Sequence, residues 1–443
     1  MSIELSEHFT YKKLIKFTLP TIVMMIFSSI YGIVDGLFVS NCVGSDAFAA
    51  VNLIMPALMI FGSVGFMIGT GGSAIVSKTL GEGDNEKANK YFSMLIYLLI
   101  ILGTVFSIIG IVFLEPIAII LGAEGQMINY CVQYGRILLV GLTAFLLQNC
   151  FQSFLVVAEM PTFGLVISVC AGITNMILDF LLIYVFKGGV IGAALATTIS
   201  QIVGGIIPLV YFIRKNKSKL KLVKTKFSLK PIVKACTNGS SEMVTNLSLS
   251  LVNMLYNIQL MKYAGTNGVV AYGIIMYVGF IFIGTYLGYS IGSAPIVGYH
   301  YGANNLDELK GLLKKSLKLI VITSIIMTGI AEIFAKPLAS IFVSYDKELL
   351  EFTTNAIRIY ALSYIVSGIN IFTSGFFTAL NDGVTSAVVS FIRTLVFQVG
   401  AILILPLLLK TTGIWLAVVV AEILSLIVSF VFLVVKRKKY KYA

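Results

Sequence analysis

Charged side chains are scarce in this sequence of 443 residues. Only 12% of the residues are Asp, Glu, Lys or Arg, whereas 58% are hydrophobic, and the mean hydropathy is +0.96. A soluble domain carries about twice that share of charge. The composition therefore excludes an ordinary water-soluble fold and predicts a chain that lies mainly in lipid.

Histidine and cysteine are also few. The two histidines, His8 and His300, lie outside the apolar segments and give little support for a His-based metal site. The five cysteines are scattered, with no CxxC pair or metal-ligand spacing, and are interpreted as small buried apolar residues. Because the sequence also has no HExxH or Ser/His motif, an enzyme is not expected.

Long apolar runs dominate the sequence instead. Each is close to the ~20 residues that a helix needs to cross a bilayer, and continuous runs such as 93–114 argue against the short alternating strands of a β-barrel. We predict an all-α polytopic membrane protein of twelve transmembrane helices, at residues 14–40, 51–77, 91–114, 131–157, 163–186, 190–213, 237–262, 270–298, 316–335, 353–380, 384–408 and 412–435.

The net charge of +12 is unevenly distributed. With both termini in the cytoplasm, most Lys and Arg residues fall on cytoplasmic connections, as the positive-inside rule describes. The dense basic segments 214–234 and 436–441 are interpreted as topology signals beside anionic membrane lipids, and no nucleic-acid partner is expected. The predicted location is the inner (cytoplasmic) membrane of a bacterial cell, crossed many times.

An internal repeat divides the chain. Residues 43–81 align without gaps with residues 264–302, and the matches include Gly44 with Gly265 and Gly81 with Gly302. The predicted domains are an N-terminal six-helix bundle (1–213), a basic cytoplasmic linker (214–236) and a C-terminal six-helix bundle (237–443). Two pseudo-symmetric bundles in one orientation would enclose a central cleft and rock to give alternating access.

Two acidic residues lie deep within predicted spans of the first half, Asp35 and Asp179. A charge at mid-bilayer costs at least ~2.5–3.5 kcal/mol, so each residue needs a specific role. Tyr31 and Asn175 precede the two acids by four residues, which places each pair on one helix face. Two carboxylates with nearby amide and hydroxyl oxygens are suited to Na⁺ or, if desolvated together, to a proton.

Other polar residues have open interpretations. Asn149 and Thr197 either complete this cation site, with Na⁺ held by Asp35, Asn175, Asp179 and Thr197, or only join helices by hydrogen bonds. Pro20 is a candidate hinge, because proline removes one backbone hydrogen bond of a helix.

The second half lacks the acid pair. Tyr256 aligns with Asp35, and its helix is polar but uncharged, so Asn253 and Tyr256 are candidates for a cleft wall in this half. Glu422 is the remaining acid within a span. It is either a second functional carboxylate or the structural partner of a nearby polar group. Glu242 is expected at the very start of its helix.

These features together resemble the multidrug and toxic compound extrusion (MATE) transporters across nearly the whole chain. The residues that carry the resemblance are Pro20, Tyr31 and Asp35, then Gly71-Gly72 and Gly81-Glu82-Gly83-Asp84, and in the second half Gly292, Pro295, Gly298 and Tyr301-Gly302. The segment Gly239-Ser-Ser-Glu242 is similar to the MepA-like branch.

The resemblance implies a V-shaped pair of bundles that exports cationic amphipathic drugs in exchange for Na⁺ or H⁺. It implies that the coupling site is formed by Tyr31, Asp35, Asn149, Asn175, Asp179 and Thr197. A flippase for lipid-linked saccharides is the alternative function, although it would be expected to place cationic side chains in the cleft. We expect a monomer with no cofactor besides the coupling ion.

Overall fold

The computed structural model describes residues 3–442, and within them all regular structure is helical. The first half contains α1 (Tyr11–Cys42), α2 (Ser45–Gly81), α3 (Asn85–Ile120), α4 (Gln126–Val140), α5 (Leu142–Val157), α6 (Pro161–Asp179), the π-helix η1 (Phe180–Val185) and α7 (Gly189–Ile213). The second half contains α8 (Leu229–Gly302), α9 (Leu306–Ile333), α10 (Ala335–Val343), α11 (Lys347–Ala361), α12 (Tyr364–Ala379), α13 (Gly383–Phe391), the π-helix η2 (Ile392–Gln398) and α14 (Val399–Tyr440).

The described helices account for the predicted number of spans. Eight are long and apolar enough to cross a membrane, and two bent pairs raise the number to ten: α4 meets α5 at 57°, and α11 meets α12 at 46°. Two of the eight stretches each contain one residue with non-helical dihedral angles, Gly265 in α8 and Lys410 in α14. Dividing the stretches there gives twelve spans, which confirms the predicted fold class.

The backbone repeats the pseudo-symmetry that the sequence predicts. Residues with positive φ occur at equivalent connections in the two halves: Gly44 and Gly265, Gly83 and Asn304, Glu159 and Asn381, Lys187 and Lys410. At Gly44 and Gly265 the φ values are 100° and 62°, where residues with a Cβ are strained. This requirement explains why the repeat keeps glycine at that connection.

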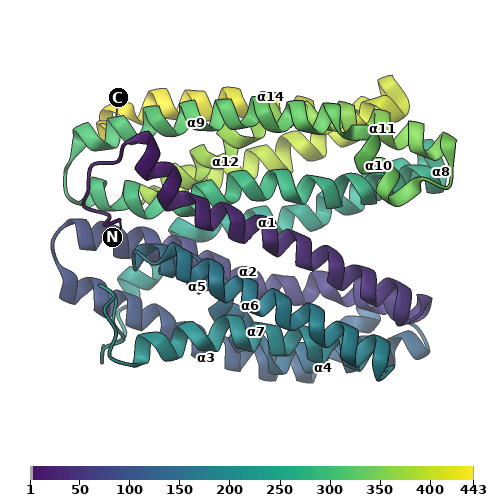
Figure 1. Ribbon diagram of the computed structural model, residues 1–443, viewed down its shortest axis with the longest axis horizontal. Coiled ribbons are helices and arrows are strands. Elements are labelled where there is room, and N and C mark those ends of the chain that lie inside the picture. The colour runs from purple at the N-terminus through teal and green to yellow at the C-terminus, as the bar shows by residue number, and fades with distance from the viewer. Residues whose placement is uncertain (1–2, 443) are drawn as a thin grey trace.

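Two bundles lie side by side, and α1 runs obliquely from one to the other (Figure 1). Leu14 and Phe17 near the start of α1 belong to an apolar cluster with Ile296 and Leu309 of the second half. Further along, Tyr31 packs against α6 of the first half. Both chain ends lie at one end of the molecule, here called the terminal end, and the opposite end is called the far end.

Glycines join the two bundles closely at the terminal end. A Cβ on Gly81 would overlap the backbone of Tyr299, and a Cβ on Gly302 would overlap the backbone of Lys78. Gly71 has the same close approach to the carbonyl of Ala235. Small residues allow helix backbones to touch in a membrane, so α2 and α8 close this end of the interface.

The N-terminal segment also connects the bundles at the terminal end. The Leu5 amide donates to Glu159 Oε1 at 2.7 Å, on the first half, and the Phe9 amide donates to Glu308 Oε1 at 2.9 Å, on the second half. His8 Nδ1 lies 2.5 Å from Glu308 Oε2. Leu5 and Phe9 are both fully buried. Residues 3–10 therefore form a strap across the two bundles.

The end of α14 is anchored at the same end through Asp382, which precedes α13. Its Oδ1 accepts from the Thr385 amide at 3.3 Å, and Lys436 Nζ lies 3.2 Å from its Oδ2. Burial alone would raise the pKa of Asp382, but hydrogen bonds from Tyr440, Thr385 and Lys436 lower it below its ordinary value.

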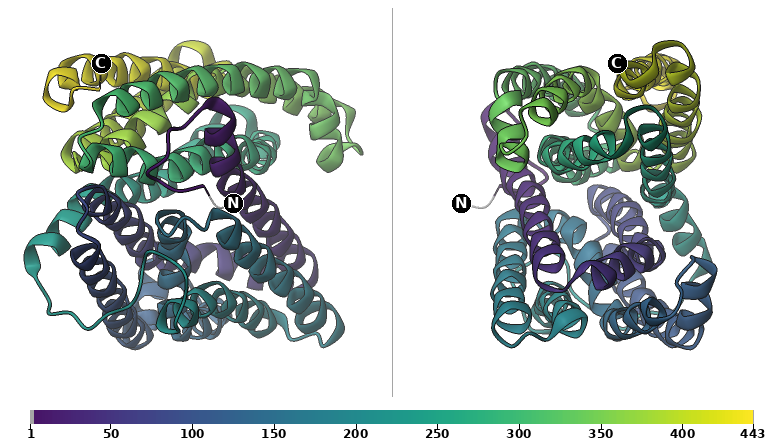
Figure 2. Two further views of the ribbon diagram at one scale, coloured as in Figure 1. Left: turned by 60° about the vertical axis from the view of Figure 1, so that its left-hand side comes forward. Right: turned by 90° about the vertical axis from the view of Figure 1, so that its right-hand side faces the viewer.

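The start of α8 differs from the sequence-based expectation. Residues 229–236, predicted as linker, are helical because α8 begins at Leu229. Glu242 consequently lies well inside a helix and not at its very start. The remaining connection, 214–228, lies at the terminal end, where Figure 2 (left) shows it crossing the end of the first bundle before α8 begins.

Candidate functional site

The candidate site begins with the contact between α1 and α6. Gly172 has no side chain, and a Cβ there would lie 2.5 Å from the Phe27 ring and 2.9 Å from the Tyr31 ring. The two helices therefore approach closely at this level. Asn175 and Asp179 follow Gly172 on the same face of α6, and both are buried, with exposed fractions of 1% and 0%.

This contact brings the two predicted acids together. Asp35 lies within hydrogen-bond reach of Asp179 and Asn175. Both Asp179 carboxylate oxygens and Asp35 Oδ1 nevertheless have no N–H or O–H donor in bonding geometry among the described residues. Two carboxylates with three oxygens that lack a donor leave room for one shared proton or one cation. Asp179 is also the last residue before η1, and π-helical turns are frequent at functional sites.

Unpartnered oxygen atoms continue around the acid pair. A cavity of about 210 Å³ is lined by Asp35 together with residues of α5, α6 and α7. The buried oxygens without a partner in bonding geometry that belong to this cluster are Asp35 Oδ1, Gln148 Oε1, Gln152 Oε1, Asn175 Oδ1, Asp179 Oδ1, Asp179 Oδ2, Thr197 Oγ1 and Gln201 Oε1. Buried polar atoms are normally paired, so this concentration indicates a site for a ligand that oxygen atoms bind.

A larger cavity of about 520 Å³ adjoins the polar one and lies where the first bundle faces α8. The two cavities share Tyr31, Asp35 and Thr197. Most of the larger wall is apolar, and Tyr277 and Phe280 of α8 complete it from the second half. Asp35 is its one acidic lining residue. The arrangement is an apolar chamber with one carboxylate, behind which Asp179 is fully buried.

The structure separates the roles of the other predicted site residues. Tyr31, Asn175 and Thr197 line the polar cavity beside Asp35. Asn149 lines it too, but its Nδ2 donates to the Gly62 carbonyl at 3.4 Å and so joins α5 to α2. This contact favours the interpretation that Asn149 joins helices by a hydrogen bond.

Pro20, the candidate hinge, lies inside α1, which is described as one helix through this residue. Its neighbours Thr18 and Thr21 pack against Gly292 of α8. Pro20 therefore lies within the contact between α1 and α8, which continues along α1 to Ser29, whose hydroxyl donates to the Phe280 carbonyl at 3.2 Å.

An arginine that we did not single out from the sequence lies inside the second bundle. Arg393, in η2, donates to Glu422 Oε1 from Nε at 3.0 Å and from a terminal guanidinium nitrogen at 2.7 Å. Asn370 Nδ2 donates to Glu422 Oε2 at 2.7 Å, and Ser429 Oγ donates to Asn370 Oδ1 at 2.9 Å. Of the two roles left open for Glu422, these contacts favour the structural partner. Arg393 could have been identified from the sequence, because it is a charged residue within the predicted span 384–408.

The predicted second-half cleft residues are placed differently. Tyr256 is fully buried, and its ring stacks on Tyr272 at 4.7 Å between centroids. Asn253 Oδ1 accepts from the Tyr272 hydroxyl at 2.7 Å. The two residues thus belong to the packing of the second bundle, while Tyr277 and Phe280 face the cavity instead.

Comparisons with known proteins agree with this architecture. A family model described as MatE matches residues 20–181 and 243–403, once in each half, as the internal repeat predicts. The multidrug export protein MepA of Staphylococcus haemolyticus is 25% identical over an alignment of 433 residues, and the match covers 94% of this chain and 91% of the relative. MepA of Staphylococcus aureus is 24% identical over an alignment of 446 residues, and the match covers 97% of this chain and 94% of the relative.

A solved structure has the same fold. It is an outward-facing conformation of a multidrug resistance MATE family transporter of the MOP superfamily, with a TM-score of 0.92, 23% identity and 98% of both chains covered. The family model spans most of this sequence, and the apolar helices are those of a multi-pass membrane protein. The chain belongs to the MatE family of membrane transporters and is not an enzyme.

Proposed function

We propose that this protein is a secondary antiporter that exports cationic amphipathic compounds from the cytoplasm in exchange for H⁺ or Na⁺. The observation that carries the proposal is the pair Asp35 and Asp179, two neighbouring carboxylates of which three oxygens, Asp35 Oδ1 and both of Asp179, have no donor in bonding geometry among the described residues. The multidrug export named for the relatives supports the same reading.

The charge of this pair indicates which kind of ion it can bind. At ~4 Å and an effective dielectric constant of ~20, two like charges repel by about 4 kcal/mol. A proton or a monovalent cation removes that repulsion, and the oxygens of Asn175 and Thr197 would complete a coordination shell for Na⁺. The residues present therefore fit either ion.

The cargo follows from the larger cavity. Its volume of about 520 Å³ suits a drug-sized molecule. The methionines in its wall, Met25, Met55 and Met59, are adaptable apolar contacts. Asp35 would pair with the positive charge of the cargo. The guanidinium of Arg393 is held by Glu422 and offers no free positive charge, which disfavours a phosphate-bearing saccharide lipid.

Competition for Asp35 would then couple the two movements. When the ion occupies the acid pair, it offsets the negative charge of Asp35, which releases the cationic cargo; when the ion leaves, Asp35 can bind the next cargo molecule. The terminal end is closed by α2 and α8 while the cavity lies where the first bundle faces α8. With both termini in the cytoplasm, this arrangement corresponds to a state that is closed toward the cytoplasm.

The test is transport by purified protein in proteoliposomes under separately imposed Na⁺ and pH gradients. Wild-type protein should transport an organic cation such as ethidium in exchange for Na⁺ or H⁺, whichever of the two imposed gradients drives it. Asp35→Asn and Asp179→Asn should each abolish this coupled transport. Asp307→Asn is the matched control, because Asp307 is exposed at the start of α9 and should leave transport unchanged.

Unchanged coupling in the double variant Asp35→Asn, Asp179→Asn would refute the proposal. If the Asp179→Asn variant loses transport but still binds ethidium, this supports cargo binding by Asp35 and ion binding that also needs Asp179, since Asp179 lies behind Asp35. Which gradient drives the wild-type protein identifies the ion.

A further inference from the structure

A groove at the terminal end lies outside the transport site. Two adjoining cavities of about 560 and 670 Å³ share Lys87, Tyr91 and Ser228 and form one continuous depression, here called the basic groove. Its first wall is formed by the end of α2 and the start of α3. Its second wall is formed by residues 224–228 and the first turns of α8.

Lysines dominate both walls of the basic groove. Lys78, Lys87 and Lys90 come from the first wall. Lys224, Lys226, Lys230 and Lys234 come from the second wall. Glu82 is the one acidic lining residue of the groove, so its positive charge is not balanced from within.

Few of these lysines are neutralised by neighbours. Lys90 pairs with Glu86 at 2.6 Å, and Lys78 lies 3.5 Å from Glu82. Within residues 3–442 no ion pair is recorded for Lys87, Lys226 or Lys230, and all three are exposed. An uncompensated group of like charges raises the free energy of the protein unless an anion binds.

The position of residues 221–228 is fixed by α3. The Lys221 amide donates to Asn89 Oδ1 at 2.7 Å, and the Val223 amide donates to Ser93 Oγ at 2.8 Å. These contacts hold the connection along α3 and so bring Lys224 and Lys226 to the groove. The groove is therefore built by specific contacts.

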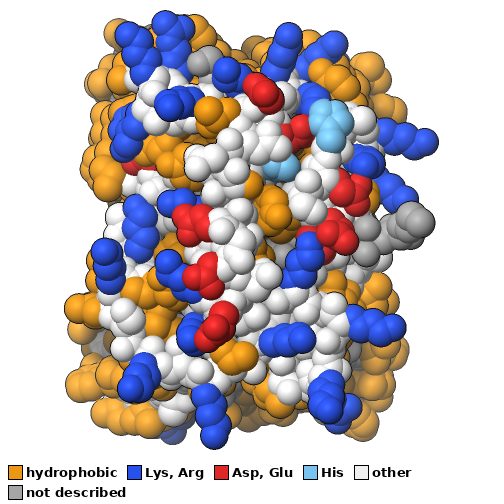
Figure 3. All heavy atoms as spheres, turned by 90° about the vertical axis from the view of Figure 1, so that its left-hand side faces the viewer, with side chains coloured by type: hydrophobic (Ala, Val, Ile, Leu, Met, Phe, Trp, Pro, Cys, Tyr) orange, Lys and Arg blue, Asp and Glu red, His pale blue; other side chains and the backbone are white. Residues whose placement is uncertain are grey.

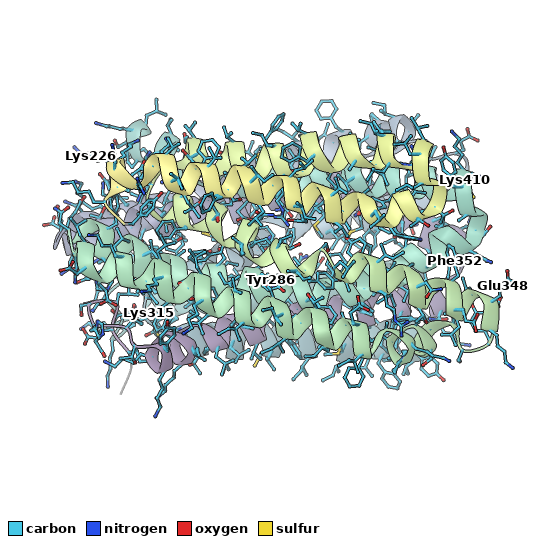
Figure 4. All side chains as sticks on the ribbon, turned by 90° about the horizontal axis from the view of Figure 1, so that it is seen from above. Lys226, Tyr286, Lys315, Glu348, Phe352 and Lys410 are labelled. Carbon is cyan, nitrogen blue, oxygen red and sulfur yellow. The ribbon has the colours of Figure 1, made fainter. Side chains whose placement is uncertain are left out.

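Large apolar side chains flank the basic groove. Phe227, Leu229 and Val233 have exposed fractions of 54%, 76% and 54%. Their exposure beside a group of lysines is expected where a protein meets the boundary between lipid chains and head groups. Figure 3 shows the terminal end with Lys and Arg side chains around its rim and apolar side chains next to them. Lys226 lies at this end, opposite Lys410 and Glu348 in Figure 4.

We propose that the basic groove binds the anionic head group of a phospholipid of the cytoplasmic leaflet, with its acyl chains against the exposed apolar flank. The location rests on the orientation given under Proposed function; the groove itself does not depend on the transported substrate or ion. Because Lys78 belongs to the first half and Lys234 to the second, one bound lipid would contact both bundles.

The test uses full-length protein in nanodiscs of phosphatidylcholine with and without phosphatidylglycerol, and native mass spectrometry counts the retained phosphatidylglycerol. The variant Lys87→Gln, Lys226→Gln, Lys230→Gln removes three groove charges. Each lysine near a membrane surface accounts for about a fivefold effect on binding to anionic lipid. Retention should therefore fall by roughly two orders of magnitude.

The matched control is Lys12→Gln, Lys310→Gln, Lys314→Gln, which removes the same charge from exposed lysines of the same end outside the groove. It should retain phosphatidylglycerol. Heat denaturation in phosphatidylcholine alone checks that both variants fold, and addition of phosphatidylglycerol should stabilise the wild type and the control but not the groove variant.

Equal retention in the groove variant and the control would overturn the proposal, whether both lose the lipid or neither does. A separate arm adds inorganic phosphate or glycerol 1-phosphate to the wild-type protein. Failure of these soluble anions to displace phosphatidylglycerol supports a lipid site, because they lack the apolar part. Displacement at equal concentration would show a site for small phosphates and overturn the assignment. A transport defect in Asp35→Asn would leave all these results unchanged.

Discussion

Substitution of Glu422 by Gln tests whether this acid is structural. The change keeps the volume of the side chain but removes the charge that accepts two hydrogen bonds from Arg393 at 3.0 and 2.7 Å. Removing one partner of a buried ion pair typically costs about 3–5 kcal/mol. The Arg393 side chain is 16% exposed, and partial contact with solvent lowers the cost of leaving it unpaired, so we expect the lower end of that range, about 3 kcal/mol.

A double-mutant cycle measures this cost. Glu422→Gln and Arg393→Gln should each lower the stability of the protein, whereas the double variant should recover most of the loss, since no buried charge is then left alone. Stability is followed by thermal unfolding in detergent, with transport measured in parallel. In the Glu422→Gln variant, the side-chain oxygen can still accept the hydrogen bond that Asn370 Nδ2 donates to Glu422 Oε2 at 2.7 Å in the wild type.

Two outcomes would refute the structural interpretation. One is a Glu422→Gln protein of wild-type stability that has lost ion dependence of transport. The other is a double variant whose loss of stability equals the sum of the two single losses, because the cycle would then show no energetic coupling between the two residues. The first result would reassign Glu422 as a functional carboxylate, and the second would remove Arg393 as its structural partner.

Three further predictions follow from other contacts. Gly172→Val should separate α1 from α6, cost about 1–3 kcal/mol through overpacking and impair coupling, which transport assays would detect; coupling unaffected by this change would contradict the geometry of the site. Asn149→Ala should lower stability by about 1 kcal/mol but leave the ion dependence of transport intact, and a changed ion dependence would make Asn149 a ligand. The pKa of Asp382 is lower in the folded protein than its ordinary value of 3.8, so its contribution to stability is present at neutral pH and lost as the pH falls below about 4. Asp382→Asn should flatten that acid dependence in unfolding curves recorded across pH, and an unchanged curve would assign the dependence to other groups.

The sequence alone predicted the features that depend on periodic or local patterns. Twelve apolar stretches predict twelve spans because the bilayer thickness fixes the length of each helix. Gly44 and Gly265 revealed the repeat because the same backbone turn recurs in both halves. The acids Asp35 and Asp179 were identifiable because a charge within an apolar run is costly wherever it occurs.

Features that depend on neighbours distant in the sequence required the structure. Gly172 allows α1 and α6 to approach closely, but this depends on the rings of Phe27 and Tyr31, which reach it only after α1 packs on α6. Tyr256 was expected to face a cleft from its alignment with Asp35, but stacking on Tyr272 buries it. Side-chain orientation across a helix interface is set by the packing of both helices, so the repeat could not determine it.

The sequence by itself determined the membrane setting, the number of helices, the two-part plan and the two acids in the first half. Only the tertiary structure decided that these acids meet with three carboxylate oxygens lacking a hydrogen-bond donor, that Arg393 neutralises Glu422, and that lysines from both halves share one groove. The reason is physical: burial cost and helix length are properties of one segment, whereas pairing of charges depends on which segments are adjacent after folding.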